Sequence, residues 1–237
     1  MLPPHDSPFP FTISLDLNAA SLRPKPEERM IKINQKYSFP LEKALFSFAL
    51  ASEAEEVFEG CNTLITGIGK VNAAYELSKA IQYRRPSLIL NLGSAGSNEF
   101  QKGEVVCCTK FVQRDMDVRG LGYAKYETPL SGLPRVLEYG LKMDGLQESI
   151  CGTGDTFEMA HAATIYNVID MEAYALAMIA MKENIPFLCL KYISDGADGN
   201  AAEDWNVQVH KAAVAYGNIL KLKKNVVSDV GSSNFLL

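Results

Sequence analysis

The 237-residue chain has no long hydrophobic run. No stretch reaches the roughly 18–20 consecutive apolar residues that a membrane-spanning helix needs. It also lacks a block of lysines and arginines, and its formal net charge is -5, so nucleic acid and anionic membrane surfaces are poor partners for it. Its composition, 47% hydrophobic and 22% charged, excludes a disordered chain. At this length we expect one large domain or two small ones, either able to bury a core.

Cysteine and histidine are both scarce. The five cysteines include no CxxC pair, and an odd number argues against a disulfide framework. We therefore expect reduced, mostly buried thiols and a cytoplasmic protein. The three histidines lie far apart in the sequence, with no cysteine or histidine at ligand spacing, which argues against a zinc site. No metal and no cofactor is expected.

Proline is concentrated near the N-terminus, where residues 1–40 contain seven of the eleven prolines. Such a segment cannot sustain a helix and has too few apolar residues for a core. We therefore expect an extended or disordered arm over residues 1–40. No continuous apolar run follows a basic start, so a secretory signal is not expected. One catalytic domain is expected over residues 41–225, followed by a C-terminal tail over residues 226–237.

From residue 41 onward, strand-like and helix-like patterns alternate. Apolar runs of strand length occur at 44–50, 62–67, 87–92, 103–113, 149–151, 168–169 and 187–193. Helical patterns occur at 51–58, where Ser52 is the expected N-cap, and at 71–82, 173–182 and 203–221. Strands that alternate with helices predict an α/β fold, a three-layer αβα sandwich whose mixed, largely parallel sheet is flanked by helices.

Polar and glycine residues follow several of the predicted strands. They occur at 53, 67–70, 93–96, 152–157, 170–172 and 194–198. In open α/β sheets, ligands bind at the carboxyl ends of the strands. We therefore expect a ligand site at this edge of the sheet, with the carboxylates Glu53, Glu172 and Asp195 as its most important groups.

Each of these features also has an ordinary structural interpretation. The glycines at 67–69 and 93–96 are typical of tight turns, and the first pair matches neither a dinucleotide fingerprint nor a P-loop. Glu172 could complement a helix dipole, and Asp195 could cap a helix. Glu53 could be a solvated residue of a first helical turn. Taken singly, each feature is explained as well by structure as by chemistry.

The order of the motifs favours chemistry. The motifs are ALASE at 49–53, TGIGKVNAA at 66–74, NLGSAG at 91–96, GDTF at 154–157, MEA at 171–173 and ISDGAD at 193–198. In this order they resemble the purine nucleoside phosphorylase superfamily. In particular they resemble its hydrolytic branch, the 5'-methylthioadenosine/S-adenosylhomocysteine nucleosidases, over about residues 44–222. The resemblance implies a nucleoside phosphorylase-like fold.

The resemblance also implies hydrolysis of the N-glycosidic bond of a purine nucleoside, through an oxocarbenium-like transition state. Asp195 would be the general acid that protonates N7 of adenine, Ser194 would orient it, and Glu53 would activate the water. Phe157 would stack on the base, and Glu172 would bind the ribose hydroxyls. The other substrate-binding residues that the resemblance implies are Ser94, Gly96, Glu158, Met171 and Trp205.

Phosphate is a poor acceptor for this site. Phosphorylases of the superfamily use arginine side chains to hold the phosphate dianion, and one of those positions is occupied by Asn91 here. Their early arginine-containing phosphate loop has no counterpart, and Glu53 near that place would repel phosphate. We therefore expect a hydrolase. A phosphorylase, and a nucleoside-binding member of the fold without catalysis, are the alternatives.

The segment with Leu121, Tyr123 and Pro129 resembles a loop that the nucleosidases lend to the neighbouring subunit. It implies a homodimer with shared active sites. The chain departs from the family at several positions. The departures are Leu50 for methionine, Lys191 for arginine, Glu158 for an apolar residue, an Arg-Asp-Met-Asp sequence at 114–117 for His-Asp-Ala-Asp, and an additional Arg119. These departures leave the 5' substituent and the base open.

Overall fold

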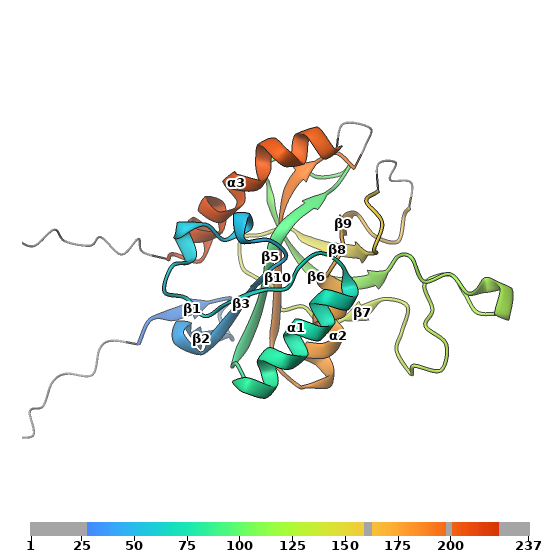
Figure 1. Ribbon diagram of the computed structural model, residues 1–237, viewed down its shortest axis with the longest axis horizontal. Coiled ribbons are helices and arrows are strands. Elements are labelled where there is room, and N and C mark those ends of the chain that lie inside the picture. The colour runs from blue at the N-terminus through green and yellow to red at the C-terminus, as the bar shows by residue number, and fades with distance from the viewer. Residues whose placement is uncertain (1–27, 159–162, 198–200, 223–237) are drawn as a thin grey trace, which may run out of the picture.

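A computed structural model describes residues 28–158, 163–197 and 201–222 of the chain (Figure 1). Its centre is a mixed sheet of eight strands. The strands are β3 (Ala44–Phe48), β4 (Thr63–Ile65), β5 (Leu88–Gly96), β6 (Val105–Gln113), β7 (Leu137–Glu138), β8 (Glu148–Thr153), β9 (Val168–Asp170) and β10 (Phe187–Asp195). Parallel pairs join β5 with β10, β3 with β4 and β5, and β8 with β6 and β9. The predicted mixed, largely parallel sheet is confirmed.

Part of this sheet closes on itself. Along its length β5 pairs with β10, and on its other side its first half pairs with β3. At its last residue, Gly96, β5 leaves β3 behind and pairs with β9. Because β10 also pairs with β6, the strands β5, β9, β8, β6 and β10 form a closed circuit. The closure brings segments that follow different strands to the mouth of one cavity.

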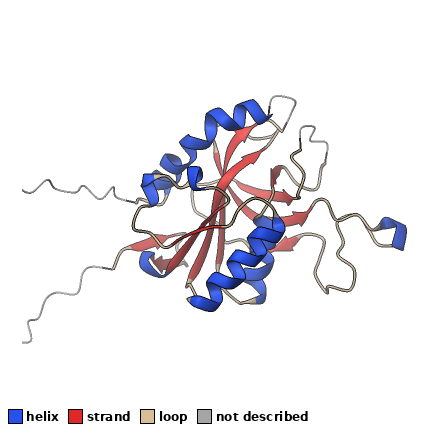
Figure 2. Cartoon of the chain, viewed as in Figure 1, coloured by secondary structure: helices blue, strands red, loops and turns tan. Residues whose placement is uncertain are grey.

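Helices cover both faces of the sheet, as the sequence predicts (Figures 1 and 2). Helices α1 (Lys70–Tyr83) and α2 (Ala173–Lys182) pack together on one face. The α1 side chains that face the core are Ala73, Leu77 and Ile81, which have helical spacing. Helix α3 (Ala201–Ile219) covers the opposite face. The three layers of the predicted αβα sandwich are therefore present.

Tyr216 anchors α3 directly below the end of the sheet. Its side chain is fully buried, and its hydroxyl lies 2.7 Å from the carbonyl of Gly93 in β5. The same hydroxyl accepts a hydrogen bond from the backbone N–H of Tyr192 in β10, at 2.8 Å. One phenol thus joins a helix to two parallel strands, three residues before the last residue of each strand.

The expected N-terminal arm is wrong for residues 30–40. Strands β1 (Met30–Lys32) and β2 (Ser38–Pro40) form an antiparallel pair, and Ile31 and Ile33 are only 1% and 2% exposed. Both belong to the core cluster that contains Phe46 of β3. The alternation of Met30, Ile31, Lys32 and Ile33 is a half-buried strand pattern, which the density of prolines obscured. Residues 1–27 and the expected tail at 226–237 lie outside the described residues.

The predicted helix over 51–58 is also wrong. Two short 3₁₀ turns occupy this segment, η2 (Ala51–Glu53) and η3 (Glu56–Phe58), and Ser52 caps no helix. Glu55 between the turns has a φ of +47°, which is incompatible with a continuous right-handed helix. Strand β5 also continues four residues beyond the predicted end at 92, so the glycines of 93–96 lie in a strand rather than in a turn.

We predict that Ile31→Ala lowers the free energy of unfolding by about 2–5 kcal/mol, the usual loss when a buried isoleucine is truncated. Met30→Ala is the matched control, because the Met30 side chain is 48% exposed; its effect should stay within about 0.5 kcal/mol. Urea unfolding measures both values. Equal, small effects of the two substitutions would show that the β1–β2 hairpin does not contribute to the core.

Candidate active site

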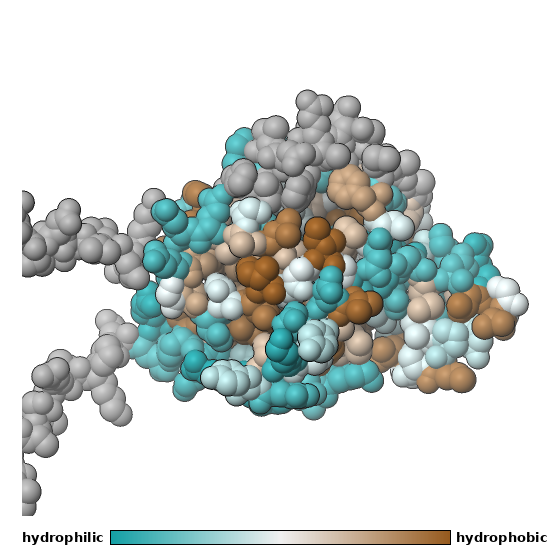
Figure 3. All heavy atoms as spheres, in the orientation of Figure 1, coloured by the Kyte–Doolittle hydropathy of each residue, from teal (hydrophilic) through white to brown (hydrophobic). Residues whose placement is uncertain are grey.

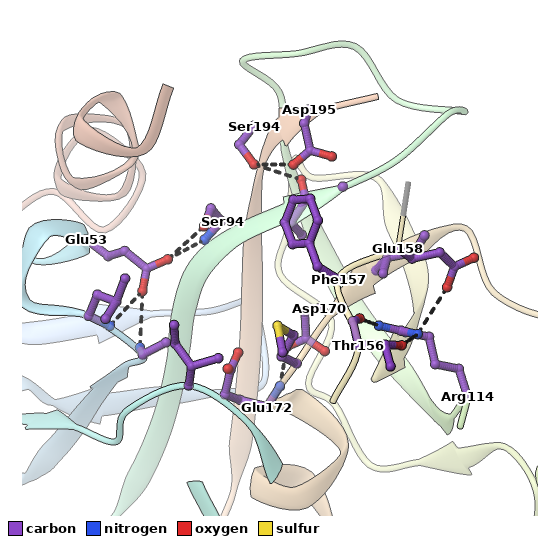
Figure 4. Close-up of a pocket in the computed structure, with 17 residues that line it drawn as sticks. Glu53, Ser94, Arg114, Thr156, Phe157, Glu158, Asp170, Glu172, Ser194 and Asp195 are labelled. Atoms are coloured by element: carbon purple, nitrogen blue, oxygen red, sulfur yellow. Dashed lines mark hydrogen bonds and ion pairs between the residues drawn. The ribbon is translucent and has the colours of Figure 1, made fainter. Parts of the chain in front are cut away.

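A cavity of about 210 Å³ opens where the strands of the closed circuit end. Most of the site residues expected from the sequence line it. They are Glu53, Ser94, Gly96, Phe157, Glu158, Met171, Glu172, Ser194 and Asp195. The departure positions Leu50 and Arg114 also line it, together with Asp170, which the sequence analysis did not select. Figure 4 shows how the polar side chains converge from separate strands.

Glu53 is held at one side of the cavity by four hydrogen bonds. The η2 turn folds its side chain back, so that Oε2 accepts from the backbone N–H groups of Ala49 and Leu50, both at 3.1 Å. Oε1 accepts from the backbone N–H of Ser94 at 2.9 Å and lies 2.8 Å from its hydroxyl. With only 3% of its surface exposed, the carboxylate has one fixed orientation. Glu53 and Ser94 therefore lie together in the wall of the cavity.

Asp195 ends β10 on another side of the cavity. Its Oδ2 lies 2.8 Å from the Ser194 hydroxyl, and its Oδ1 accepts from the backbone N–H of Ala197 at 2.9 Å. Gly96 lies directly beside it. A Cβ at Gly96 would be 2.6 Å from Asp195 Oδ1, so only glycine leaves room for this carboxylate. The residue predicted to bind substrate, Gly96, has this steric role as well as its place in the cavity wall.

A buried ion pair lies at the base of the site. Lys191 Nζ is 2.9 Å from Asp170 Oδ2, and their side chains are 2% and 1% exposed. Asp170 also accepts from the Thr153 hydroxyl at 2.6 Å and from the backbone N–H of Ala173 at 2.8 Å. Burial opposes ionisation of Asp170, but the Lys191 charge and these hydrogen bonds outweigh it and lower the pKa of the carboxyl. Both groups are charged, and each neutralises the other.

Glu172 lines the cavity next to this ion pair. Its Oε1 accepts a 2.8 Å hydrogen bond from the backbone N–H of Gly69, which precedes α1 and has a φ of +94°. The glycine turn at 67–69 thus presents a backbone donor at the start of a helix, where a negative charge is favoured. Burial raises the pKa of Glu172 to about 7, the Asp170 charge adds to the rise, and Lys191 opposes it.

Arg114 and the loop at 154–158 form the opposite end of the cavity. Arg114 Nη1 lies 3.0 Å from the Thr156 hydroxyl and 3.2 Å from Glu158 Oε2. Its Nη2 donates to the carbonyls of Gly154 and Thr156. Between this group and Asp195, the Phe157 ring lies in the cavity (Figure 4) and is half exposed. Apart from the departure of Arg114 from the family pattern, nothing in the sequence pointed to these contacts.

The remaining predicted residues lie elsewhere. Leu121, Tyr123 and Pro129 belong to the segment between β6 and β7, which projects from the body (right in Figure 1). None of the three lines the cavity of its own chain. We call residues 116–136 the projecting segment. Trp205 falls within α3, and its side chain lies outside the described residues.

Among the described residues we find neither a metal site nor a helix that could span a membrane. Among them, no group of three or more His, Cys, Asp or Glu side chains is arranged to hold a metal ion. In the same part of the chain, every helix is too short or too polar to cross a bilayer. The five cysteines are all unbridged.

Comparison with known proteins assigns the family. A family model for the phosphorylase superfamily matches residues 62–221. The chain belongs to the phosphorylase superfamily. Within it, the chain is similar to 5'-methylthioadenosine/S-adenosylhomocysteine nucleosidases from Anoxybacillus flavithermus and Haemophilus influenzae. The first is 27% identical over 192 residues, covering 70% of this chain and 82% of the relative. The second is 31% identical over 161 residues, covering 59% and 69%.

Solved structures of two other proteins share the fold. An Asp-to-Asn variant of the Helicobacter pylori nucleosidase, with 5'-methylthioadenosine in its active site, superposes with a TM-score of 0.68 at 20% identity. The match covers 76% of this chain and 96% of that structure. The futalosine hydrolase of the same organism gives a TM-score of 0.68 at 19% identity, covering 76% and 96%. At these identities, the likeness establishes the nucleoside phosphorylase-like fold.

The raised pKa of Glu172 predicts a pH-dependent contribution to stability. Because the folded state favours the protonated form, the contribution is fully present below the ordinary pKa of 4.5 and is lost as the pH rises through about 7. Glu172→Gln, which is neutral at every pH, should therefore gain stability relative to the wild type between about pH 4.5 and about pH 8. Urea unfolding at the two pH values measures the difference, and a difference that is the same at both would contradict the prediction.

Proposed function

We propose that this protein hydrolyses the N-glycosidic bond of a purine nucleoside, with 5'-methylthioadenosine or S-adenosylhomocysteine as substrate. The products are adenine and the 5-substituted ribose. The observation that carries the proposal is the placement of three buried carboxylates, Glu53, Glu172 and Asp195, around one cavity. Hydrolysis of a glycosidic bond needs a proton for the leaving group, an activated water and stabilisation of a positively charged sugar.

Each carboxylate suits one of these tasks. Asp195, oriented by the Ser194 hydroxyl, delivers the proton to N7 of the purine. Glu53, fixed by Ser94 and two backbone amides, orients the water and accepts its proton. Glu172 binds the ribose hydroxyls, and its negative charge stabilises the cationic sugar. The three groups approach the nucleoside from different sides, as separate acid, base and sugar-binding groups must.

Water is a better acceptor than phosphate in this cavity. Among its described lining residues, Arg114 is the one lysine or arginine, and both of its Nη atoms are engaged by the 154–158 loop. Lys191 is neutralised by Asp170 beneath the cavity. A phosphate dianion would therefore meet Glu53 without a compensating cation. The names of the Anoxybacillus and Haemophilus relatives, both nucleosidases, support the same reaction.

The base occupies the end of the cavity with Phe157, and its six-membered ring points toward the Glu158 backbone. A planar purine can stack on the exposed Phe157 ring. Met171 packs under the ribose, close to Glu172. This placement puts N7 near Asp195 and C1' near Glu53, which lie on different sides of the Phe157 ring (Figure 4).

The enzyme acts as a cytoplasmic homodimer that shares its active sites. Apolar side chains are exposed at the start of α1, where Ile68 is 49% and Val71 77% exposed. They are also exposed on the projecting segment, where Leu121 is 74% and Leu130 95% exposed (Figure 3). Exposed apolar surfaces of this kind are typical of protein interfaces. The projecting segment, with Tyr123 and Pro129, completes the 5' end of the partner's cavity.

We predict that Asp195→Asn lowers kcat for adenine release by about 10²–10⁴-fold, because a positioned general acid is lost. Asp144→Asn, a change at an exposed residue, is the matched control and should leave kcat unchanged. Chromatography of the released base measures both rates. Cleavage by Asp195→Asn at the wild-type rate would refute the proposed role of Asp195.

We also predict that the double substitution Leu121→Ala and Tyr123→Ala raises KM for 5'-methylthioadenosine by about 5- to 100-fold, the scale of one or two lost apolar contacts. Val214→Ala, which removes an exposed apolar side chain from α3, should leave KM unchanged. Light scattering gives the oligomeric state of each variant. A wild-type protein that is monomeric and fully active would exclude the shared site.

A further inference from the structure

Two consecutive residues that follow β6 hold the loop at 154–158 from opposite sides. On the inner side, Arg114 has only 5% of its side chain exposed. Its two Nη atoms meet four oxygens, which are the Thr156 hydroxyl, Glu158 Oε2 and the carbonyls of Gly154 and Thr156. The loop thus accepts three hydrogen bonds and one ion pair from the two Nη atoms, which carry four hydrogens.

On the outer side, Asp115 holds the first half of the same loop. Its Oδ2 accepts from the backbone N–H of Asp155 at 2.9 Å and from the Lys70 ammonium at 2.5 Å. Lys70 begins α1, and its own backbone N–H donates to Asp155 Oδ1 at 2.8 Å. The loop is thereby tied to β6 and to the start of α1 at the same time.

The loop is shaped around the Arg114 side chain. A Cβ at Gly154 would lie 3.0 Å from both Cγ and Cζ of Arg114, so a larger residue there would crowd the Arg114 side chain. Glu158 also lies 3.5 Å from the Tyr166 hydroxyl, which extends the contacts to the segment just before β9. Every residue from 154 to 158 except Phe157 is thus bonded through its side chain or backbone, and Phe157 is the residue presented to the cavity.

We propose that Arg114 is a positioning residue for the purine base. Its Nη atoms are directed to the loop, and its contribution to base binding acts through the loop. It holds the loop in the shape in which the Phe157 ring and the Glu158 backbone receive the base. Because the loop is already ordered in the free protein, binding of the base does not cost the conformational entropy of ordering it. The inference rests on the proposed function in taking the occupant of this end of the cavity to be a purine.

Lysine cannot replace Arg114 in this role. Its ammonium has three donors at one point, whereas the guanidinium reaches four oxygens from two separate nitrogens in a fixed plane. The effect of the substitution is therefore expected on base affinity rather than on proton transfer. The hydrogen bonds that orient Glu53 come from the 49–50 backbone and Ser94, and Asp195 is oriented by Ser194 and the Ala197 backbone.

The test measures the dissociation constant of free adenine by calorimetry, which needs no turnover. Arg114→Leu and Arg114→Lys should each weaken adenine binding by about 10- to 100-fold, the scale for loss of charge-assisted hydrogen bonds. KM for the nucleoside should rise by the same factor, while kcat at saturation changes less than about threefold. Arg85→Leu is the matched control, because it breaks an exposed ion pair with Glu183 and should leave adenine affinity unchanged.

The outcomes separate the inference from the proposed function. Adenine affinity in both Arg114 variants equal to that of the wild type would overturn the inference alone. A fall in kcat with unchanged KM would also overturn it, because Arg114 would then act on the chemical step. If the leucine variant does not fold, the lysine variant, which keeps the charge beside Glu158, carries the test. A wild-type protein that binds no adenine would overturn the proposed function and the inference with it.

Discussion

The ion pair between Lys191 and Asp170 is the interaction on which the site depends. It puts one positive charge beneath a cavity that gathers several carboxylates, and without it Glu172 and Asp170 would repel each other in a buried environment. Removing one partner of such a pair costs about 3–5 kcal/mol, because the other charge stays buried. The pair also fixes the backbone at the start of α2, since Asp170 accepts from the N–H of Ala173. The Lys191–Asp170 pair thus sets both the charge balance of the site and the position of Glu172.

Closure of the sheet makes this pair possible. Asp170 ends β9 and Lys191 lies in β10, and these strands pair with β5 rather than with each other. The two side chains meet near the end of β5, where this strand has left β3 and pairs with β9. Two glycines of β5 serve the same geometry, because a Cβ at Gly93 would lie 3.3 Å from Glu53 Oε1 and one at Gly96 would lie 2.6 Å from Asp195 Oδ1. Strand β5 carries no side chain at the two positions where the carboxylates of Glu53 and Asp195 approach it.

The sequence predicted what depends on local pattern. Apolar runs located the main strands, helical spacing located α1 and α2, and the rule that polar residues follow strands selected Glu53, Glu172 and Asp195. Contacts set by closure were not predictable, because the pairing of Asp170 with Lys191 joins strands that are not neighbours. Local composition led to two wrong predictions. The many prolines predicted an arm where Ile31 lies in a buried strand, and helix-forming residues at 51–58 predicted a helix where the chain forms two 3₁₀ turns. At 51–58 the four hydrogen bonds that fold the Glu53 side chain back outweigh the helical propensity of the segment.

The central claim is that three carboxylates, with no uncommitted lysine or arginine among the described residues that line the cavity, make water the acceptor. The most direct measurement is the initial rate of adenine release from 5'-methylthioadenosine in phosphate-free buffer, repeated with added inorganic phosphate at constant ionic strength. The account predicts full activity without phosphate, no increase with it, and no sugar 1-phosphate among the products. A rate that requires phosphate, with the 1-phosphate as product, would contradict it.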